Sequence, residues 1–241
     1  MAPRPTLRRL VDELARRHPE LADPAGAVAA GRVRVDGRFV TNPAARIRRD
    51  AAIVVSPGAV ALRGEAKLAA ALARFPVPVP GAVALDAGAA AGGFTRVLLA
   101  HGARRVYAVD AGHGQLLGSL RQDPRVVDLE GVNLGELDRA RLPEPVSVVT
   151  LDLSYLAVAD AAPQLGRVEL AAGAHLVALV KPMFELHLAA PPVGDGAVEA
   201  AVGRAAGGLA AAGWQVRGSM PSPVTGAGGA REALLHATRP A

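Results

Sequence analysis

The sequence predicts an α/β protein built around a doubly wound, mostly parallel sheet, with a small basic α+β module before it. Residues 61–241 give the first indication, since short apolar runs alternate there with stretches of helical periodicity, as in parallel sheets covered by helices. Residues 1–60 give the second, because an Arg-rich amphipathic stretch is followed by a short segment of alternating apolar and basic residues. We therefore expect two domains, residues 1–60 and residues 61–241.

The composition of the 241-residue chain excludes several classes of protein. Hydrophobic residues make up 51% and charged residues 20%, so the chain is not intrinsically disordered. Runs without charge end at about a dozen residues, below the roughly 18 that a membrane-spanning helix needs. The start of the chain lacks the apolar region of a secretory signal, and the absence of cysteine excludes disulfides and thiolate metal sites. These observations favour a cytoplasmic protein.

The basic module should contain two helices and a hairpin. Residues 7–18 place four apolar side chains on one helical stripe, with the arginines mostly outside it. Residues 24–30 begin with proline and can form a second, short helix. In residues 31–40, valine alternates with arginine ahead of an Asp36-Gly37 turn signal, which predicts a β-hairpin.

The positive charge of the chain is confined to this module. Residues 1–60 hold eleven arginines against six acidic residues, a net charge of +5, whereas residues 61–241 hold sixteen residues of each sign. Phosphate neutralisation dominates nucleic-acid affinity, so the module is a candidate for binding a polyanion such as RNA; a solvated Arg-rich face is the alternative. The candidate RNA-binding residues are Arg8, Arg9, Arg16, Arg32, Arg34 and Arg38.

The second domain begins beyond a Pro/Gly-containing segment, residues 56–64, where we expect the boundary. A helix over residues 65–75 leads into the alternating pattern. The last two apolar runs are joined by a connection too short for a crossover helix, so they should pair antiparallel. Five parallel strands closed by such a hairpin form the Rossmann-like methyltransferase variant of the doubly wound sheet. The expected strands are 83–88, 106–111, 126–129, 146–153, 175–182, 214–221 and 232–239.

A glycine-rich turn links the first strand of this sheet to a helix. The glycines of residues 85–95 let the backbone approach a ligand closely, and the amides at the helix start can bind an anion. Asp86 would repel a pyrophosphate but attract a cationic sulfonium, and Asp110, ending the next strand, can accept both ribose hydroxyls of an adenosyl group. These features favour S-adenosylmethionine, although a tight turn alone would also need glycine. The candidate cofactor-binding residues are Asp86, Gly88, Gly92, Gly93, Phe94, Asp110, Asn133 and Asp152.

The use of lysine is a further clue to chemistry. Of 27 basic residues 25 are arginine, and only Lys67 and Lys181 are lysine. Arginine stays charged, whereas the compact ammonium of lysine can lose its proton in a suitable environment. The two lysines are therefore the first candidates for catalysis.

The order of motifs resembles one family over nearly the whole chain. LRGEAKL, LDAGAAAGGFT, VDAGHGQL, LDLSYL, VKPMFE and GGAREALL follow a segment, residues 29–47, that is similar to the αL RNA-binding fold of ribosomal small-subunit protein four. This arrangement resembles the TlyA hemolysin family, ribosomal RNA 2′-O-methyltransferases related to FtsJ and RrmJ. The resemblance implies a catalytic Lys-Asp-Lys-Glu tetrad, and the matching residues are Lys67, Asp152, Lys181 and Glu232.

The resemblance implies an enzyme that transfers a methyl group from S-adenosylmethionine to a ribose 2′-hydroxyl of ribosomal RNA, without needing a metal. Lys181 would act as the general base, Asp152 would orient it, and Lys67 with Glu232 would position the ribose. A structural salt bridge between Lys181 and Asp152 is the alternative for that pair. Two other functions stay open: chemistry on a small-molecule substrate with the same cofactor, or RNA binding without catalysis.

Three features depart from the family pattern. Ala90 and Ala91 stand where the family usually has Ser-Thr before the double glycine. Residues 186–196 are shorter than the Gly/Lys-rich loop that normally follows the KPxFE motif, and residues 233–236 read ALLH in place of a YFLW-like end. Aromatic residues total only 3%, which leaves few platforms for base stacking. The first departure removes hydroxyls that could bind the carboxylate of the cofactor, and the other two concern the substrate, so the target is less certain than the chemistry.

Overall fold

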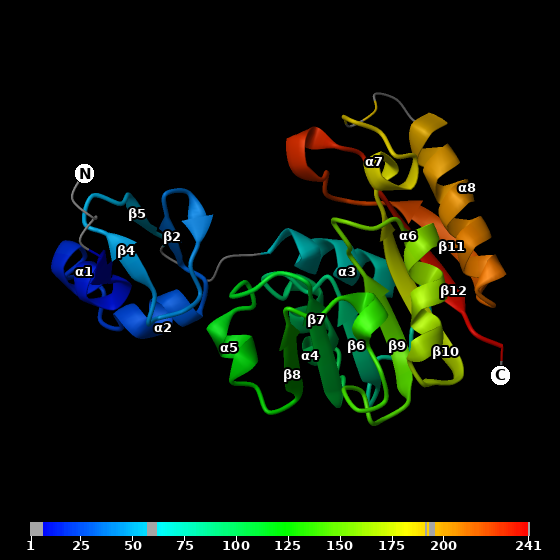
Figure 1. The fold of residues 1–241 in the computed structure, drawn as a ribbon, viewed down its shortest axis with the longest axis horizontal. Coiled ribbons are helices and arrows are strands. Elements are labelled where there is room, and N and C mark those ends of the chain that lie inside the picture. The colour runs from blue at the N-terminus through cyan, green and yellow to red at the C-terminus, as the bar shows by residue number, and fades with distance from the viewer. Residues whose placement is uncertain (1–6, 57–61, 191, 193–195, 241) are drawn as a thin grey trace. The chain divides into compact units, whose positions relative to one another are not determined.

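The structure is a computed structural model that describes residues 7–56, 62–190, 192 and 196–240, with the side chains of Arg38 and Ala227 outside the described part. It forms two compact units (Figure 1). The first unit consists of residues 1–61 and 113–124, and the second of residues 62–112 and 125–241. Within the described ranges no helix is both long and apolar enough to cross a membrane.

The first unit contains two small antiparallel sheets and short helices. Strand β1 pairs with β4, and β2 pairs with both β3 and β5. Leu10, Leu14, Val28 and Val33 lie in its buried apolar core. The elements are β1 (Leu7–Arg9), α1 (Leu10–Arg17), α2 (Pro24–Ala29), β2 (Val33–Val35), β3 (Arg38–Phe39), β4 (Arg46–Arg48), β5 (Ile53–Val55) and α5 (Gly118–Arg121).

The first helix begins later than the periodicity predicts. Leu7 pairs with Arg48 and Arg9 with Arg46 in an antiparallel ladder, so residues 7–9 are a strand and not the first turn of a helix. Pairing with a segment far along the chain overrides the local helical pattern, which is a common reason for misplaced helix boundaries. The expected hairpin is present, because Asp36 and Gly37 both have positive φ, 49° and 80°, as a two-residue type I′ turn requires.

Residues 113–124 belong to the first unit although the chain has already entered the second. The hydroxyl of Thr41 donates to the carbonyl of Gly114 at 3.1 Å, and a Cβ on Gly118 would lie 3.1 Å from that of Ala29. Leu117 is buried and lies against Gly31. The two predicted domains, residues 1–60 and residues 61–241, are contiguous stretches, whereas the first compact unit takes in residues 113–124 as well.

The second unit is built on a seven-stranded sheet of order β11-β12-β10-β9-β6-β7-β8. Strands β8, β7, β6, β9 and β10 are parallel, and the hairpin β11-β12 joins β10 antiparallel. The predicted methyltransferase variant of the Rossmann-like sheet is thus confirmed. The strands are β6 (Val83–Ala87), β7 (Arg105–Asp110), β8 (Val126–Glu130), β9 (Val146–Leu151), β10 (Leu170–Val180), β11 (Gln215–Pro221) and β12 (Ala233–Thr238).

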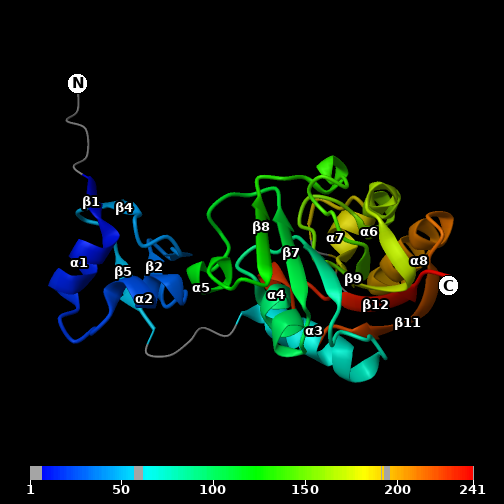
Figure 2. The same ribbon diagram turned by 90° about the horizontal axis from the view of Figure 1, so that it is seen from below.

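Helices cover both faces of this sheet (Figure 2). Helices α3 and α4 pack together on one face, while α6 and α8 pack together on the other. Because side chains alternate along a strand, Leu85 and Val149 join the core beneath α8, whereas the neighbouring Asp86 faces Thr95 of α4. The helical elements are α3 (Arg63–Arg74), α4 (Gly93–Ala100), η1 (Leu134–Glu136), α6 (Val158–Ala161), η2 (Ala162–Arg167), α7 (Pro182–Glu185), α8 (Gly196–Ala211) and η3 (Ala227–Gly229).

Candidate active site

A pocket of about 350 Å³ in the second unit brings together four residues that are far apart in the sequence. Asp152 follows β9 and Lys181 follows β10, so both lie at the carboxyl ends of adjacent parallel strands, where doubly wound sheets bind their ligands. Lys67 comes from α3, and Glu232 directly precedes β12. All four residues predicted to form the tetrad line this single pocket.

The Lys181 ammonium is held by three acceptors. Its Nζ lies 2.7 Å from Oδ1 of Asp152, and it donates to the carbonyl of Leu153 and the hydroxyl of Ser154, both at 2.9 Å. The ring of Phe184 lies 5.9 Å from the same nitrogen. These contacts fix the position of Nζ beside the carboxyl ends of β9 and β10. The side chains of Lys181 and Asp152 both keep some exposure to solvent.

The Lys67 and Glu232 side chains form a second ion pair that is more deeply buried. Nζ of Lys67 lies 2.5 Å from Oε2 of Glu232, and the two side chains are only 7% and 6% exposed. Buried charges are stable in proteins only when they are paired, because desolvation of either charge alone costs several kcal/mol. The pair therefore ties α3 to the start of β12 across the pocket.

Two glycines allow α3 to come close enough to carry Lys67 into the pocket. A Cβ on Gly93, the first residue of α4, would lie 3.0 Å from Cα of Gly64 in α3 and 3.2 Å from the backbone nitrogen of Glu65. A side chain at Gly64 would in turn meet the ring of Phe94. Gly93 and Phe94 thus serve the packing of α3 against α4. Phe94 is buried and is not part of the tetrad pocket lining, so its contact with a cofactor stays a prediction.

The glycine-rich turn has the backbone conformation that the sequence indicated. Gly88 and Gly92 have φ of 86° and 94°, and Gly92 caps the start of α4. Gly88 lines the pocket, and a Cβ there would lie 2.4 Å from the carbonyl oxygen of Asp152. Even the non-glycine Ala90 has a positive φ, 46°. Glycine at position 88 therefore lets the turn lie directly against the backbone that follows β9.

The carboxylate of Asp86 lies behind this turn and not on its ligand side. It is completely buried, and it accepts hydrogen bonds from the hydroxyls of Thr95 at 2.6 Å and Thr150 at 2.9 Å. Burial raises the pKa of Asp86 to about 6, against the lowering effect of the two threonines. A completely buried carboxylate cannot make the direct contact with a sulfonium that the sequence predicted for Asp86. Its hydrogen bonds with Thr95 and Thr150 instead hold the strand before the turn against α4 and β9.

The Asp110 carboxylate lies at the carboxyl end of β7, as predicted. Its Oδ2 accepts from the amide of Ala90 at 2.8 Å, and its Oδ1 accepts from the amide of Gly112 at 2.7 Å. Each oxygen keeps a further lone pair for a ligand hydroxyl. Asn133 is exposed after the end of β8, the neighbouring strand. Neither residue is part of the tetrad pocket lining.

Several pocket residues were not singled out from the sequence. Arg63, Ser154 and Phe184 line the pocket beside the tetrad. Ser154 accepts a hydrogen bond from Lys181, and Phe184 lies three residues after Lys181 in the sequence. Their signal in the sequence was their place inside the motifs LRGEAKL, LDLSYL and VKPMFE, which is too weak to assign a contact without the fold.

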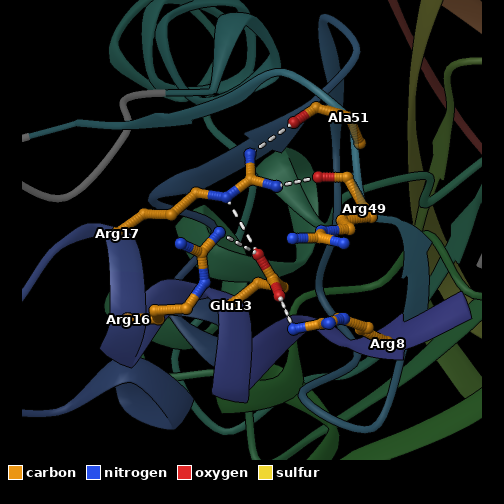
Figure 3. Close-up of polar contacts among 6 residues, drawn as sticks. All are labelled: Arg8, Glu13, Arg16, Arg17, Arg49 and Ala51. Atoms are coloured by element: carbon orange, nitrogen blue, oxygen red, sulfur yellow. Dashed lines mark hydrogen bonds and ion pairs between the residues drawn. The ribbon is translucent and has the colours of Figure 1, made fainter.

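Three arginines of the first unit surround one glutamate (Figure 3). The carboxylate of Glu13 pairs with Arg8 at 3.2 Å, Arg16 at 2.7 Å and Arg17 at 2.9 Å. Hydrogen bonds from these guanidinium groups, first from Arg16, lower the pKa of Glu13 to about 2. Arg17 also donates to the carbonyls of Arg49 and Ala51, the latter at 2.7 Å, so it holds the unit together while the other two remain more exposed.

The remaining candidate RNA-binding arginines lie on the hairpin and on β1. Arg9 and Arg34 are exposed, and the guanidinium of Arg34 lies 4.1 Å from the centroid of the Phe39 ring. Arg32 is half-buried and donates to the carbonyl of Ser56 at 2.9 Å. The side chain of Arg38 is outside the described part of the structure. Four of the six candidates, Arg8, Arg9, Arg16 and Arg34, thus keep surface exposure.

The chain is similar to known RNA methyltransferases. Residues 60–239 match the model of the FtsJ-like methyltransferase family. The chain is 40% identical to the 16S/23S rRNA (cytidine-2′-O)-methyltransferase TlyA of Mycobacterium tuberculosis, over 88% of this chain and 81% of that protein. It is 37% identical to YqxC of Bacillus subtilis, a candidate rRNA methyltransferase, over 87% of this chain and 77% of that protein.

A solved structure extends the similarity to the fold. The structure of a candidate hemolysin from Streptococcus thermophilus is 31% identical in sequence and superposes with a TM-score of 0.71, covering 98% of this chain and 89% of that one. The family model covers the second unit, and the relatives extend the match over most of the chain. The chain therefore belongs to the FtsJ-like methyltransferases and, among them, to the TlyA family.

Proposed function

We propose that this protein transfers a methyl group from S-adenosylmethionine to the 2′-hydroxyl of a cytidine ribose in ribosomal RNA. The observation that carries the proposal is the single pocket lined by Lys67, Asp152, Lys181 and Glu232. The name of the Mycobacterium tuberculosis relative supplies the nucleotide and the two ribosomal RNAs as the first substrates to test. The cytoplasm, where ribosomes are found, is the corresponding location.

The residues around the glycine-rich turn suit the cofactor. Gly88 lines the tetrad pocket, and its lack of a Cβ lets the turn lie directly against the carbonyl of Asp152. Asp110, at the end of β7, presents a carboxylate that can accept hydrogen bonds from ribose hydroxyls. Gly88, Asp110 and Asn133 would hold the cofactor, which supplies an electrophilic methyl group when bound.

Lys181 is suited to remove the proton of the ribose hydroxyl. As an ammonium it uses all three N–H groups on Asp152, Leu153 and Ser154, which fixes the direction of its nitrogen. As a neutral amine the same nitrogen has a lone pair that can accept the hydroxyl proton, and Asp152 then stabilises the charge that forms on Lys181. A ribose hydroxyl is a poor nucleophile, so alignment and proton removal are the two contributions that the pocket must make.

The Lys67–Glu232 pair is suited to position the ribose and not to exchange protons with it. Both side chains are nearly inaccessible and satisfy each other at 2.5 Å. Their pairing fixes the distance between α3 and the start of β12, and both residues line the pocket. We assign the general-base role to Lys181 and a positioning role to Lys67 and Glu232.

The first unit is proposed to dock the enzyme on folded RNA as an αL-type RNA-binding module. Its exposed arginines, Arg8, Arg9, Arg16 and Arg34, can neutralise phosphates. The single carboxylate of Glu13 orients the side chains of Arg8 and Arg16 but neutralises only part of their positive charge. RNA affinity should therefore fall steeply with salt concentration.

The decisive experiment supplies labelled S-adenosylmethionine with each purified ribosomal subunit and maps the product. Wild-type protein should transfer label to RNA, and digestion should place the methyl group on a ribose 2′-oxygen. Lys181→Met, which keeps a similar side-chain length but cannot accept a proton, is the matched control and should transfer no label. Labelling of the base, of protein or of neither subunit by an active, cofactor-binding enzyme would contradict the proposal.

A further inference from the structure

A second pocket, of about 300 Å³, lies in the same unit and shares no lining residue with the tetrad pocket. It is formed where the end of α3 meets β10, β11 and β12. Its titratable lining residues are Arg74, His175, Arg217 and His236, and among the described lining residues there is no carboxylate. We call this the basic pocket. Its composition is that of a site for an anion.

A β-bulge places Arg217 in the basic pocket. The register between β11 and β12 shifts between Val216 and Gly218, so Arg217 is the extra residue. Bulges re-aim side chains and are frequent beside functional sites. The Nε of Arg217 donates to the hydroxyl of Thr238 at 2.8 Å, and Nη2 donates to Gln215 Oε1 at 2.7 Å. The guanidinium is thus oriented by neutral acceptors and keeps its full charge.

The second guanidinium is that of Arg74, at the end of α3. It lies 5.7 Å from the centroid of the Phe75 ring. In the part of the chain that the structure describes, neither Arg74 nor Arg217 has a carboxylate within 4.0 Å, in contrast to Arg104 and Arg139, which form ion pairs. Two uncompensated guanidinium groups therefore border the same pocket.

Two histidines form the floor of the basic pocket. His175 Nδ1 and His236 Nε2 are 3.0 Å apart, and the Phe75 ring stacks on His236. His236 is only 2% exposed, and its Nδ1 is buried without a hydrogen-bond partner. Burial, then His175 and then Arg217 lower the pKa of His236 to about 4, and burial with Arg217 lowers that of His175. Both imidazoles therefore favour the neutral form, and the positive charge of the pocket is that of Arg74 and Arg217.

Residues of the same helix, α3, line both the tetrad pocket and the basic pocket. Arg63 and Lys67 near the start of α3 line the tetrad pocket, and Arg74 at its last position lines the basic pocket. The eleven steps from Arg63 to Arg74 correspond to about 16 Å of helix. A polymer with regularly spaced negative charges can occupy both pockets at once, whereas a small anion would occupy only one.

We propose that the basic pocket binds a backbone phosphate of the ribosomal RNA substrate, at a distance from the ribose that is methylated. This inference rests on the proposed function, because it takes the RNA to be the substrate at the tetrad. Phe75 is almost fully buried, so the pocket offers no open aromatic face for a base. Recognition is therefore of the phosphate and independent of the base sequence.

The test uses full-length protein and the ribosomal subunit that the wild type methylates. Arg217→Gln and Arg74→Gln should each raise KM for the subunit about threefold to tenfold and reduce the slope of log affinity against log salt by about one. The kcat and the affinity for S-adenosylmethionine should stay within about twofold, because neither residue lines the tetrad pocket. Arg139→Gln removes the same charge from a side chain that is 78% exposed and paired with Glu169, so it is the matched control and should change neither KM nor slope.

The outcomes separate this inference from the proposed function. If the wild type methylates no ribosomal RNA, the proposed function fails. If the wild type is active but both arginine variants keep its KM and salt slope, the basic pocket does not bind RNA and the inference is overturned.

Titration of the imidazole signals of His175 and His236 by NMR distinguishes an RNA phosphate from a free anion. A short RNA should shift these signals in the wild type and in Arg139→Gln but not in Arg217→Gln. A shift with inorganic phosphate and none with RNA would overturn the assignment to RNA.

Discussion

Nζ of Lys181 lies 2.7 Å from Oδ1 of Asp152 at the ends of two adjacent parallel strands. Because 25 of the 27 basic residues of the chain are arginine, a lysine at this position should reflect the need for a group that can lose its proton. Lys181→Arg keeps the positive charge but cannot act as a base, so kcat should fall by about 10² to 10⁴. Calorimetry with S-adenosylmethionine should show unchanged binding.

The same replacement at Lys67 provides the comparison. If Lys67 positions the ribose through its pairing with Glu232, Lys67→Arg should cost less in kcat than Lys181→Arg does. Near-normal turnover in Lys181→Arg would remove the general-base role and leave Lys181 a structural or electrostatic one.

The stabilising effects of Lys67 and Glu232 should be coupled, because each charge is stable in its buried position only when the other is present. Glu232→Gln leaves the ammonium of Lys67 buried without a counter-charge, so the free energy of unfolding should fall by about 3 kcal/mol. Replacing both residues by methionine removes both charges and should recover most of that loss while abolishing methyl transfer. Urea unfolding of Lys67→Met, Glu232→Met and the double variant gives the coupling energy. An additive double variant would show that the two residues do not act as a pair.

The pH dependence of stability should reveal the buried Asp86. Its pKa is raised from an ordinary value of 3.8 to about 6, so the folded state keeps this proton to a higher pH than the unfolded state does. The stabilising contribution of Asp86 is present below about pH 4 and is lost as the pH rises through 6, a change of about 3 kcal/mol.

Asp86→Asn isolates this effect, since asparagine does not titrate. The unfolding free energy of Asp86→Asn relative to the wild type should increase by about 2 kcal/mol between pH 4 and pH 7. A constant difference over this range, measured by urea unfolding, would show that burial does not raise the pKa of Asp86.

The close approach of α3 and α4 should be sensitive to a single methyl group. Gly93→Ala places a Cβ 3.0 Å from Cα of Gly64, so α3 must move and Lys67 with it. We expect lower turnover and a lower melting temperature. Gly203→Ala in α8 meets no atom within 4 Å and should instead stabilise the protein by about 0.5–1 kcal/mol without changing turnover. Equal behaviour of the two variants would contradict the packing role of Gly93.

The arginines around Glu13 should divide into RNA-binding and structural residues. Arg16 is 57% exposed, so Arg16→Gln should weaken RNA binding and reduce its salt slope by about one with little effect on the melting temperature. Arg17 donates to the carbonyls of Arg49 and Ala51 as well as to Glu13, so Arg17→Gln should lower the stability of the unit by about 1 kcal/mol. The opposite assignment of the two effects would refute this division.

The sequence predicted the sheet because apolar runs are local patterns, whereas the four tetrad residues were implied by the family resemblance. Apolar runs fixed the strands, and two rare lysines marked Lys67 and Lys181 before any geometry was known. Long-range contacts escaped prediction. Leu7–Arg9 is a strand only because β4 pairs with it, and the side to which Asp86 points depends on Thr95 and Thr150. The pairing of His175 with His236 depends likewise on strand register, which no local pattern specifies.

The placement of residues 113–124 in the first unit has a consequence for the order in which the protein folds. Domains generally fold as units during synthesis, with the N-terminal domain first. Here the N-terminal unit lacks α5 and the Thr41 contact with Gly114 until residue 124 has left the ribosome. By then β6 and β7 of the other unit have already been made. The nascent chain therefore carries an unfinished first unit while the sheet of the second begins to form, and a fragment ending at residue 61 would lack part of its own structure.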